Sequence, residues 1–328
     1  MSSQPNVLVI GGNGYVGVEL VNKLLKNNYK VTSYDLMIYG NNLIEDPNLI
    51  NIKGDIRNID MLDSHIKGKD LVIHLACISN DPSFELNPKL GKDINLDSFL
   101  PIVNSCKKNK IKRFIYASSS SVYGVKSEKN VDELLKLEPL TDYSKYKAEC
   151  EKLLLDNHSS IFTPVVLRPA TVCGFSKRQR LDVIVNIFTN LAFHKNEISI
   201  FGGNQLRPNI HIKDMVDSYL KVIEAESSLI DLEIFNVGNI NQSVSDIASI
   251  VKNNINKKVS LKKIETDDNR SYHISSKKFI NKLDFEFKYN IKDAIKDLVY
   301  AFENNLLVDT LSNDNYFNIK KMQNIKLK

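Results

Sequence analysis

Short apolar runs of strand length alternate with amphipathic stretches over the first two-thirds of the chain. The runs are Val7–Ile10, Val31–Tyr34, Leu71–Leu75, Arg113–Ala117 and Val165–Leu167. They are apolar on both faces, as parallel strands are when helices cover both sides of a sheet. The stretches between them have helical periodicity and are Tyr15–Leu25, Asp60–Ile66, Leu96–Lys107 and Tyr143–Leu155. Repeated strand–helix units predict an α/β fold with a doubly wound parallel sheet.

The pattern changes after about Gly174, where isolated strands such as Ile198–Phe201 stand among helices. The helical segments here are Leu181–Ala192, Met215–Glu224, Ser245–Asn253 and Ile291–Phe302. We expect residues 1–174 to form a first domain, whose sheet later segments complete. Residues 175–315 would form mainly a smaller α/β lobe. Residues 316–328 are basic and polar, which predicts a solvated tail.

Composition and charge exclude several classes of protein. The chain has 328 residues, of which 42% are apolar and 25% charged, which is ordinary for a globular protein with a large core. A net charge of +5 does not suggest a dedicated nucleic-acid binder. No apolar run approaches the roughly 20 residues that span a bilayer, and the N-terminus has no signal-peptide pattern, so we expect a cytoplasmic location. The four cysteines form no C-x-x-C pair, and no metal site is expected.

A glycine-rich segment, G-G-N-G-Y-V-G, lies directly between the first strand and the first helix. Gly11 would make the tight turn, Gly14 would let the backbone approach a pyrophosphate, and Gly17 would let helix and strand pack closely. The phosphates would lie on the free amides at the start of the helix, near Tyr15 and Val16. This placement predicts a Rossmann-type domain that binds a dinucleotide.

Acidic residues after the second and third strands suit the adenosine half of such a ligand. Asp35 ends the second strand, 18 residues after Gly17, where a carboxylate can accept both ribose hydroxyls. The two residues that follow it are not basic, which favours NAD over NADP. A third strand is expected just before Gly54, ahead of the run Leu71–Leu75, and Asp55 and Ile56 follow it and are placed to meet the adenine.

A tyrosine and a lysine stand four residues apart in Y-S-K-Y-K, on one face of a predicted helix. An ammonium group beside a phenol favours the phenolate, which would make Tyr143 a usable base near neutral pH with Lys147 as its partner. Hydroxyls at Ser118–Ser121 follow the strand ending at Ala117, at the sheet edge where open α/β sheets bind ligands. Y-x-x-x-K is common by chance and has weight only together with the glycine loop, Asp35 and the serines.

Together these motifs resemble the extended short-chain dehydrogenase/reductases, and more narrowly the NAD-dependent nucleotide-sugar epimerase/dehydratase family typified by UDP-galactose 4-epimerase. The resemblance runs from about Val7 to Phe302 and rests on G-G-x-G-x-x-G, Asp35, G-D-I-R, H-L-A, S-S-S-S-V-Y-G and Y-S-K-Y-K. It implies that Ser119 is the catalytic serine, Tyr143 the base and Lys147 its partner. It also implies coenzyme contacts from Leu75, Ala76, Asn95 and Ser118, besides Tyr143 and Lys147.

The resemblance extends to a substrate site in the second lobe. L-R-P-N-I-H-I-K-D resembles the family segment whose arginine meets the diphosphate of the sugar nucleotide, which implies that role for Arg207. Asp214 would cap the following helix. The other candidates for the substrate are Asn80, Ser120, Thr171, Arg180, Asn186 and Arg270, with Arg178 beside them. For Arg178, Arg180 and Arg270, a solvent-exposed position without a ligand explains the sequence equally well.

Departures from the family pattern narrow the reaction. The family's 4,6-dehydratases carry an Asp-Glu pair just after the catalytic threonine, and related decarboxylases use a glutamate there. Ser120 and Ser121 stand at these positions, so dehydration and decarboxylation are disfavoured. Thr171 replaces a family asparagine, and Asp142 replaces the proline before the catalytic tyrosine. The segment from Arg168 to Asn186 resembles a subgroup that contains both epimerases and one-way 4-dehydrogenases.

The resemblance therefore implies an NAD-dependent nucleotide-sugar 4-epimerase that acts through a transient 4-keto sugar, in surface polysaccharide or glycan precursor synthesis. A 4-dehydrogenase or 4-ketoreductase would use the same residues and stays open. A 4,6-dehydratase or a non-catalytic NAD-binding protein is less favoured. The family also implies a homodimer or larger homo-oligomer that pairs through the helices at 96–107 and 143–155. No nucleic-acid or membrane partner is expected.

Overall fold

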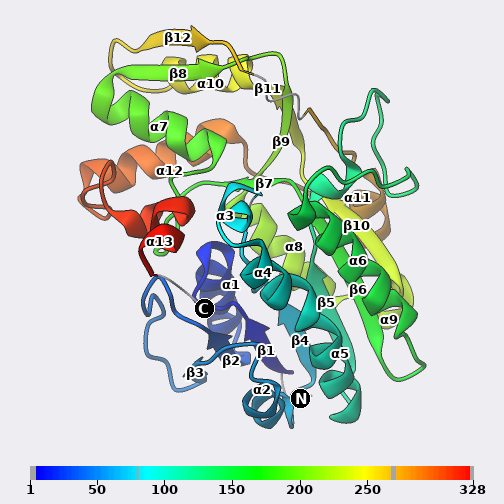
Figure 1. Ribbon diagram of the computed structural model, residues 1–328. Coiled ribbons are helices and arrows are strands. Elements are labelled where there is room, and N and C mark those ends of the chain that lie inside the picture. The colour runs from blue at the N-terminus through cyan, green and yellow to red at the C-terminus, as the bar shows by residue number, and fades with distance from the viewer. Residues whose placement is uncertain (1–4, 80, 267–270, 326–328) are drawn as a thin grey trace.

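The computed structural model describes residues 5–79, 81–266 and 271–325. Its main sheet contains β1 (Asn6–Ile10), β2 (Lys30–Asp35), β3 (Leu49–Lys53), β4 (Leu71–His74), β5 (Arg113–Ala117), β6 (Thr163–Pro169) and β10 (Glu233–Val237). The strand order is β10-β6-β5-β4-β1-β2-β3, and every pairing is parallel (Figure 1). The predicted Rossmann-type sheet is confirmed, and all five predicted runs are strands in it. The strand β10, at one edge of the sheet, comes from late in the chain.

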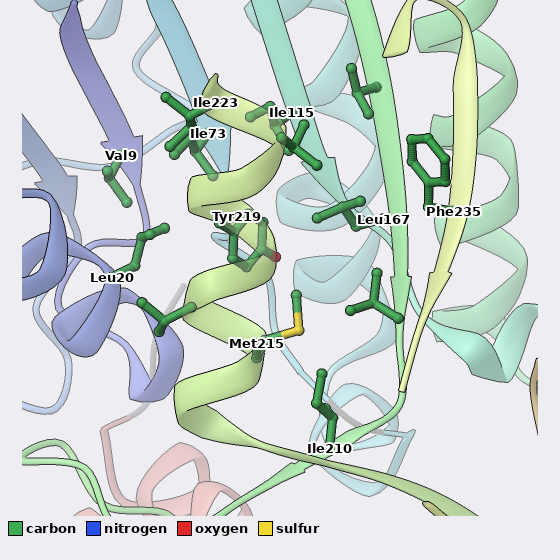
Figure 2. Close-up of a cluster of buried hydrophobic side chains, with 14 of the residues drawn as sticks. Val9, Leu20, Ile73, Ile115, Leu167, Ile210, Met215, Tyr219, Ile223 and Phe235 are labelled. Carbon is green, nitrogen blue, oxygen red and sulfur yellow. The ribbon is translucent and has the colours of Figure 1, made fainter. Parts of the chain in front are cut away.

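Helices cover both faces of this sheet because its strands are apolar on both faces. One face carries α1 (Tyr15–Lys26) and α8 (Ile212–Glu224), and the other carries α2 (Ile59–Ile66), α5 (Phe99–Lys108) and α6 (Asp142–Asp156). Figure 2 shows the side chains that α8 and the sheet place against one another: Met215, Tyr219 and Ile223 from the helix, and Val9, Ile73, Ile115 and Leu167 from the strands. Burial of each such side chain contributes roughly 1.5–3 kcal/mol to folding.

A smaller lobe lies over the carboxyl ends of the strands (Figure 1). It contains a three-stranded sheet of β7 (Thr171–Cys173), β9 (Leu206–His211) and β11 (Ile240–Ser243), and a pair of β8 (Glu197–Phe201) and β12 (Ser260–Ile264). Its main helices are α7 (Ile184–Lys195), α10 (Val244–Asn253) and α12 (Ile291–Glu303). These helices and strands enclose an apolar core of their own, which includes Val185, Ile198 and Ile247.

Short elements complete the described chain. They are α3 (Asp81–Glu85), α4 (Pro88–Lys92), the π-helix η1 (Asp93–Asp97), the 3-10 helix η2 (Ser120–Tyr123), α9 (Ser227–Ile230), α11 (Lys277–Leu283), the 3-10 helix η3 (Asp314–Tyr316) and α13 (Asn318–Ile325). Within the described ranges, no helix is both long enough and apolar enough to cross a bilayer.

The helix α13 corrects the expectation of a solvated tail after residue 316. Asn318 is 3% exposed, its backbone N–H donates to Asp182 (2.8 Å), and its side-chain amide donates to Ser79 (2.8 Å). In Figure 1 this helix, in red, lies between the α7 and α12 layer and the helices α1 and α3. The basic composition of this segment gives no sign that the helix packs against the rest of the protein. The contact depends on one buried asparagine, Asn318, and not on the lysines.

The cap of α8 is a second correction. His211, not Asp214, caps this helix, because its Nδ1 accepts a hydrogen bond from the backbone N–H of Lys213 (3.2 Å). The carboxylate of Asp214 instead accepts from the backbone N–H groups of Lys288 and Tyr289, both at 3.0 Å. Asp214 therefore ties the chain before α12 to the first turn of α8, which is a structural role of another kind.

Candidate active site

The strand order of the main sheet reverses between β1 and β4, and a cavity opens where these strands end. Its volume is about 570 Å³. Residues from the loops after β1, β2, β4 and β5 line one side, and residues from the smaller lobe, such as Arg207, line the other. A crevice outside the carboxyl ends of the strands at a switch point is where open α/β sheets bind ligands.

The glycine loop forms the floor of the cavity. A Cβ atom on Gly17 would lie 2.1 Å from the carbonyl oxygen of Gly11, so only glycine lets α1 start this close to β1. Gly11 has a φ of +91°, and a Cβ there would lie 2.6 Å from the backbone nitrogen of Ala76. Gly14 is the N-cap of α1 and supplies no side-chain cap, and the first turn carries no acidic residue. The first amides of α1 therefore remain available to an anion.

Asp35 lies beside this loop and is held in place by two backbone donors. Its carboxylate accepts from the N–H of Met37 (2.7 Å) and of Asn13 (3.0 Å). Burial raises the pKa of Asp35 above its ordinary value. The pKa of Asp55 is lowered instead: burial would raise it, but the hydrogen bonds and charge of Arg57, at 2.6 Å, outweigh that effect.

Ser119 and Tyr143 both line the cavity, and Lys147 lies behind them. Ser119 is the N-cap of η2, and its hydroxyl accepts from the backbone N–H of Ser121 (3.2 Å). Tyr143 lies in the first turn of α6, whose start is fixed by a capping box between Thr141 and Ser144.

Lys147 comes one turn later in α6 and is 3% exposed. Its Nζ donates to the carbonyl oxygen of Ala117 (2.6 Å) and lies 5.9 Å from the ring centroid of Tyr143. The four-residue spacing seen in the sequence thus places the ammonium group beside the phenol. This arrangement can take up and return a proton at the phenol oxygen.

Comparison with known proteins places this geometry in a family. A model of the NAD dependent epimerase/dehydratase family matches residues 7–238. The chain belongs to this family. A putative UDP-glucose 4-epimerase from Methanocaldococcus jannaschii is 32% identical over 257 residues, which cover 76% of this chain and 82% of that protein.

Two solved structures show the same architecture. The UDP-glucose 4-epimerase of Thermotoga maritima, in complex with UDP-glucose, has a TM-score of 0.82 at 25% identity and covers 92% of this chain and all of its own (100%). The dTDP-glucose 4,6-dehydratase of Streptomyces venezuelae, with NAD and TYD bound, shares the fold at a TM-score of 0.82 and 20% identity, covering 91% of this chain and 97% of its own. The description of the family names both epimerases and dehydratases, and a relative from Dictyostelium discoideum that is 28% identical over 236 residues is named as a dTDP-D-glucose 4,6-dehydratase.

The coenzyme of the family is NAD, and the residues of this chain fit it. The cavity-facing side of Gly14 is open, since the nearest contact of a Cβ there is the Gly11 oxygen at 3.3 Å. The free amides of α1 and the carboxylate of Asp35 complete a cradle for a pyrophosphate and a ribose. Arg178, whose buried Nε and Nη1 have no acceptor among the described residues, is one of the residues that line the same cavity.

Most of the predicted site residues line this one cavity. Besides Ser119 and Tyr143 they are Gly11, Gly14, Tyr15, Val16, Gly17, Asp35, Asp55, Ile56, Leu75, Ala76, Ser118, Ser120, Thr171, Arg180 and Arg207. Arg207 comes from β9, and its guanidinium carbon lies 5.6 Å from the ring centroid of Tyr272. Asn80 and Arg270 lie outside the described residues.

Two predicted asparagines hold loops and are not among the residues that line the cavity. The amide of Asn95 accepts from the N–H of Ile78 (2.8 Å) and donates to its carbonyl (3.0 Å), which fixes the loop after β4. Asn186 is fully buried, and its amide bonds to Gly174, Arg180 and the hydroxyl of Tyr15. Both side chains shape the site through the backbone that they hold.

Sequence reasoning missed a buried ion pair beneath the serines. Glu151 and Arg168 are 2% and 3% exposed and are joined by hydrogen bonds of 2.6, 3.0 and 3.2 Å. Glu151 also accepts from the hydroxyl of Ser118, and Arg168 donates to that of Tyr123 (2.8 Å). The signal was present, because Glu151 follows Lys147 by four residues and so lies on the same face of α6.

Proposed function

We propose that this protein is an NAD-dependent nucleotide-sugar 4-epimerase that acts through a transient 4-keto sugar. The observation that carries the proposal is that Ser119 and Tyr143, with Lys147 behind them, open into the same cavity as the glycine loop, while Ser120 and Ser121 place no carboxyl group beside them. An epimerase needs a group that moves one proton at the sugar and needs no second acid or base to expel water. The relatives named as 4-epimerases support this reading.

The proposed steps at the sugar follow from the side chains. The Tyr143 oxygen takes the proton of the sugar 4-hydroxyl and later returns it to the keto oxygen. Bound NAD supplies a reversible acceptor for the hydrogen at C4. Lys147 places its Nζ 5.9 Å from the centre of the phenol ring, and Ser119 donates a hydrogen bond to the sugar oxygen as charge develops on it.

Arg207 is proposed to hold the diphosphate of the substrate. It lines the smaller-lobe side of the cavity and stacks against Tyr272, which orients the planar guanidinium for bidentate phosphate binding. Thr171, at the start of β7, lines the cavity as well and replaces the family asparagine with a shorter hydroxyl.

A 4-dehydrogenase or 4-ketoreductase would use the same residues and is the second candidate. This candidate stays open because the segment from Arg168 to Asn186 resembles a subgroup that contains both epimerases and one-way 4-dehydrogenases. A 4,6-dehydratase is disfavoured because Ser120, which lines the cavity, has no carboxyl to exchange protons at C5 and C6.

The experiment that tests the proposal uses purified protein without added coenzyme and a panel of UDP-, GDP-, CDP- and dTDP-sugars. NMR identifies the products, and absorbance at the NADH band follows any reduced coenzyme. We expect a C4 epimer and no lasting NADH signal, whereas a 4-keto product with accumulating NADH would establish the dehydrogenase instead.

A matched pair of variants tests the assigned base. Tyr143→Phe should lower kcat by roughly 100- to 10,000-fold, because the group that moves the proton is gone. Tyr146→Phe, three residues further along α6, removes the hydroxyl but keeps the ring that packs against Phe84, and it is expected to leave turnover unchanged. Equal turnover by Tyr143→Phe and the unaltered protein would contradict the assignment of the base, and no turnover by either would leave only a non-catalytic NAD-binding role.

The expected homodimer stays a prediction, as do the cytoplasmic location and a role in polysaccharide or glycan precursor synthesis. The outward residues of α5 and α6 include Asn104, Lys145, Glu149 and Lys152, and none of the large apolar side chains of these two fully described helices is exposed. Such a surface differs from the apolar core of an obligate dimer. Sedimentation velocity tests the pairing, and a monomer at working concentration would contradict it.

A further inference from the structure

Two arginines reach from the smaller lobe into the cavity, on the loop between β7 and α7. Arg178 is 4% exposed, and its guanidinium carbon lies 3.6 Å from the ring centroid of Tyr39. Its Nη2 donates to the side-chain oxygen of Asn318 in α13 (2.7 Å). Arg180 pairs with Asp182 at 2.9 Å, and both arginines line the cavity.

These guanidinium groups keep buried donors without acceptors. Within the described ranges, Nε and Nη1 of Arg178 and Nη2 of Arg180 have no hydrogen-bond partner. Arg178 also has no carboxylate ion pair there, and burial lowers its pKa to about 10. A buried guanidinium without an ion-paired carboxylate is costly, and orphaned donors of this kind suit an anion that is not part of the chain.

The neighbours of the two arginines identify which anion fits. Arg178 stacks on Tyr39, four residues after Asp35, and lies within electrostatic range of that carboxylate. Hydrogen bonds tie the loop of Arg180 to Tyr15, the first residue of α1: Ser176 donates to the Tyr15 carbonyl oxygen (2.9 Å), and the Asn186 amide donates to the Tyr15 hydroxyl (3.0 Å) and to the Arg180 carbonyl oxygen (2.8 Å). The pair therefore spans the part of the cavity between the ribose carboxylate and the free amides of α1, which is where the pyrophosphate of a dinucleotide lies in this type of site.

The helix α13 holds the arrangement in place. Asn318 bonds to Arg178 through its side-chain oxygen, to Ser79 through its amide, and to Asp182 through its backbone N–H. Ile319 and Met322, one and four residues further on, line the same cavity. The helix thus connects the loop after β4, the arginine loop and the cavity wall.

We propose that Arg178 and Arg180 bind the pyrophosphate of the coenzyme from the smaller lobe, with Asn318 as the residue that positions Arg178. The second lobe then contributes to retention of the coenzyme, and the assignment of Arg180 moves from the substrate to NAD. The proposal concerns the coenzyme alone and stands for an epimerase and for a dehydrogenase alike.

The test compares Arg178→Met and Arg180→Met with Arg207→Met, a matched arginine on the substrate side of the cavity. NADH fluorescence measures the dissociation constant, and analysis of the denatured protein measures the NAD carried through gel filtration. Loss of charge-assisted phosphate bonds should weaken NADH binding by roughly 10- to 100-fold in the first two variants. Asn318→Ala should weaken it less, and Arg207→Met should leave it unchanged while weakening the binding of UDP.

Further readouts separate phosphate binding from a merely structural role. Without coenzyme, Arg178→Met should melt at the same temperature as the unaltered protein or higher, because it removes an unpaired buried charge. Its affinity for ADP should fall, and its affinity for adenosine should not. The proposal is overturned if Arg178→Met retains NAD as the unaltered protein does, or if the coenzyme-free variant melts lower. The proposal is also overturned if the variants lose affinity only for NADPH, which would assign the arginines to a 2′-phosphate. A loss of affinity only for UDP would assign them to the substrate and overturn the proposal as well.

Discussion

Removal of Arg168 should destabilise the protein far more than removal of the whole Glu151–Arg168 pair. The two side chains are 2% and 3% exposed, and three of the hydrogen bonds of Glu151 come from Arg168. In Arg168→Met the carboxylate keeps only the donor from Ser118 among the described residues and stays buried. Loss of one partner of a buried pair costs about 3–5 kcal/mol, so we expect the free energy of unfolding to fall by that amount.

The double variant Glu151→Leu with Arg168→Met should recover much of this loss. Apolar side chains of similar volume can replace a buried pair at little cost, but the hydroxyls of Ser118 and Tyr123 lose a partner each. We therefore expect a net loss of about 1–2 kcal/mol and a coupling energy of at least about 2 kcal/mol between the two positions.

Urea unfolding of coenzyme-free protein, followed by circular dichroism, measures these differences, with an unchanged m-value as the check on two-state behaviour. The exposed pair of Lys92 and Asp97, at 2.7 Å, is the control, and Lys92→Met should leave the midpoint where it is. An Arg168→Met effect below about 1 kcal/mol, or a double variant no more stable than the single one, would refute the reasoning.

Further predictions concern the coenzyme site. Gly17→Ala should cost about 3 kcal/mol of stability, since its Cβ would lie 2.1 Å from the Gly11 oxygen, whereas Gly14→Ala should fold normally and bind NADH more weakly; equal melting temperatures for the two would contradict this. Because burial raises the pKa of Asp35, the folded chain takes up this proton at a higher pH than the unfolded chain does. As the pH falls through that pKa, coenzyme-free protein gains stability from Asp35, and the gain is lost again as the pH rises. The affinity for NADH should fall as the pH falls, because the protonated carboxyl no longer accepts two ribose hydrogen bonds. Measurements of stability and NADH affinity against pH should show both effects in the unaltered protein and neither in Asp35→Asn.

The main sheet and the floor of the site could be predicted from the sequence because their signals are local. The run Val7–Ile10, the glycines that follow it and the helix from Tyr15 stand next to one another in the chain, so order alone places them. Tyr143 and Lys147 are four residues apart, and helical periodicity puts them on one face. Each of these features depends on residues that are close to one another in the sequence.

The parts that escaped prediction depend on contacts between distant segments. The Arg178 loop meets Tyr39 and Asn318 across more than a hundred residues of sequence, and a composition of lysines and asparagines gives no sign that α13 docks. From the sequence, Asp214 is the expected helix cap because it directly precedes the predicted segment Met215–Glu224, but α8 starts earlier, at Ile212, and His211 is its N-cap. Periodicity cannot decide between two polar side chains that compete for the same backbone donors.

The most direct test of the central claim follows the hydrogen at C4 of the sugar. A UDP-hexose that carries deuterium at C4, prepared as one epimer, is incubated with the protein in ordinary water without added coenzyme, and the products are analysed by NMR. We predict that the other C4 epimer forms with the deuterium still at C4, because a hydride that passes to bound NAD and back does not exchange with water, whereas the hydroxyl proton that Tyr143 moves does. Appearance of solvent hydrogen at C4, or a 4-keto product with lasting NADH absorbance, would contradict the account.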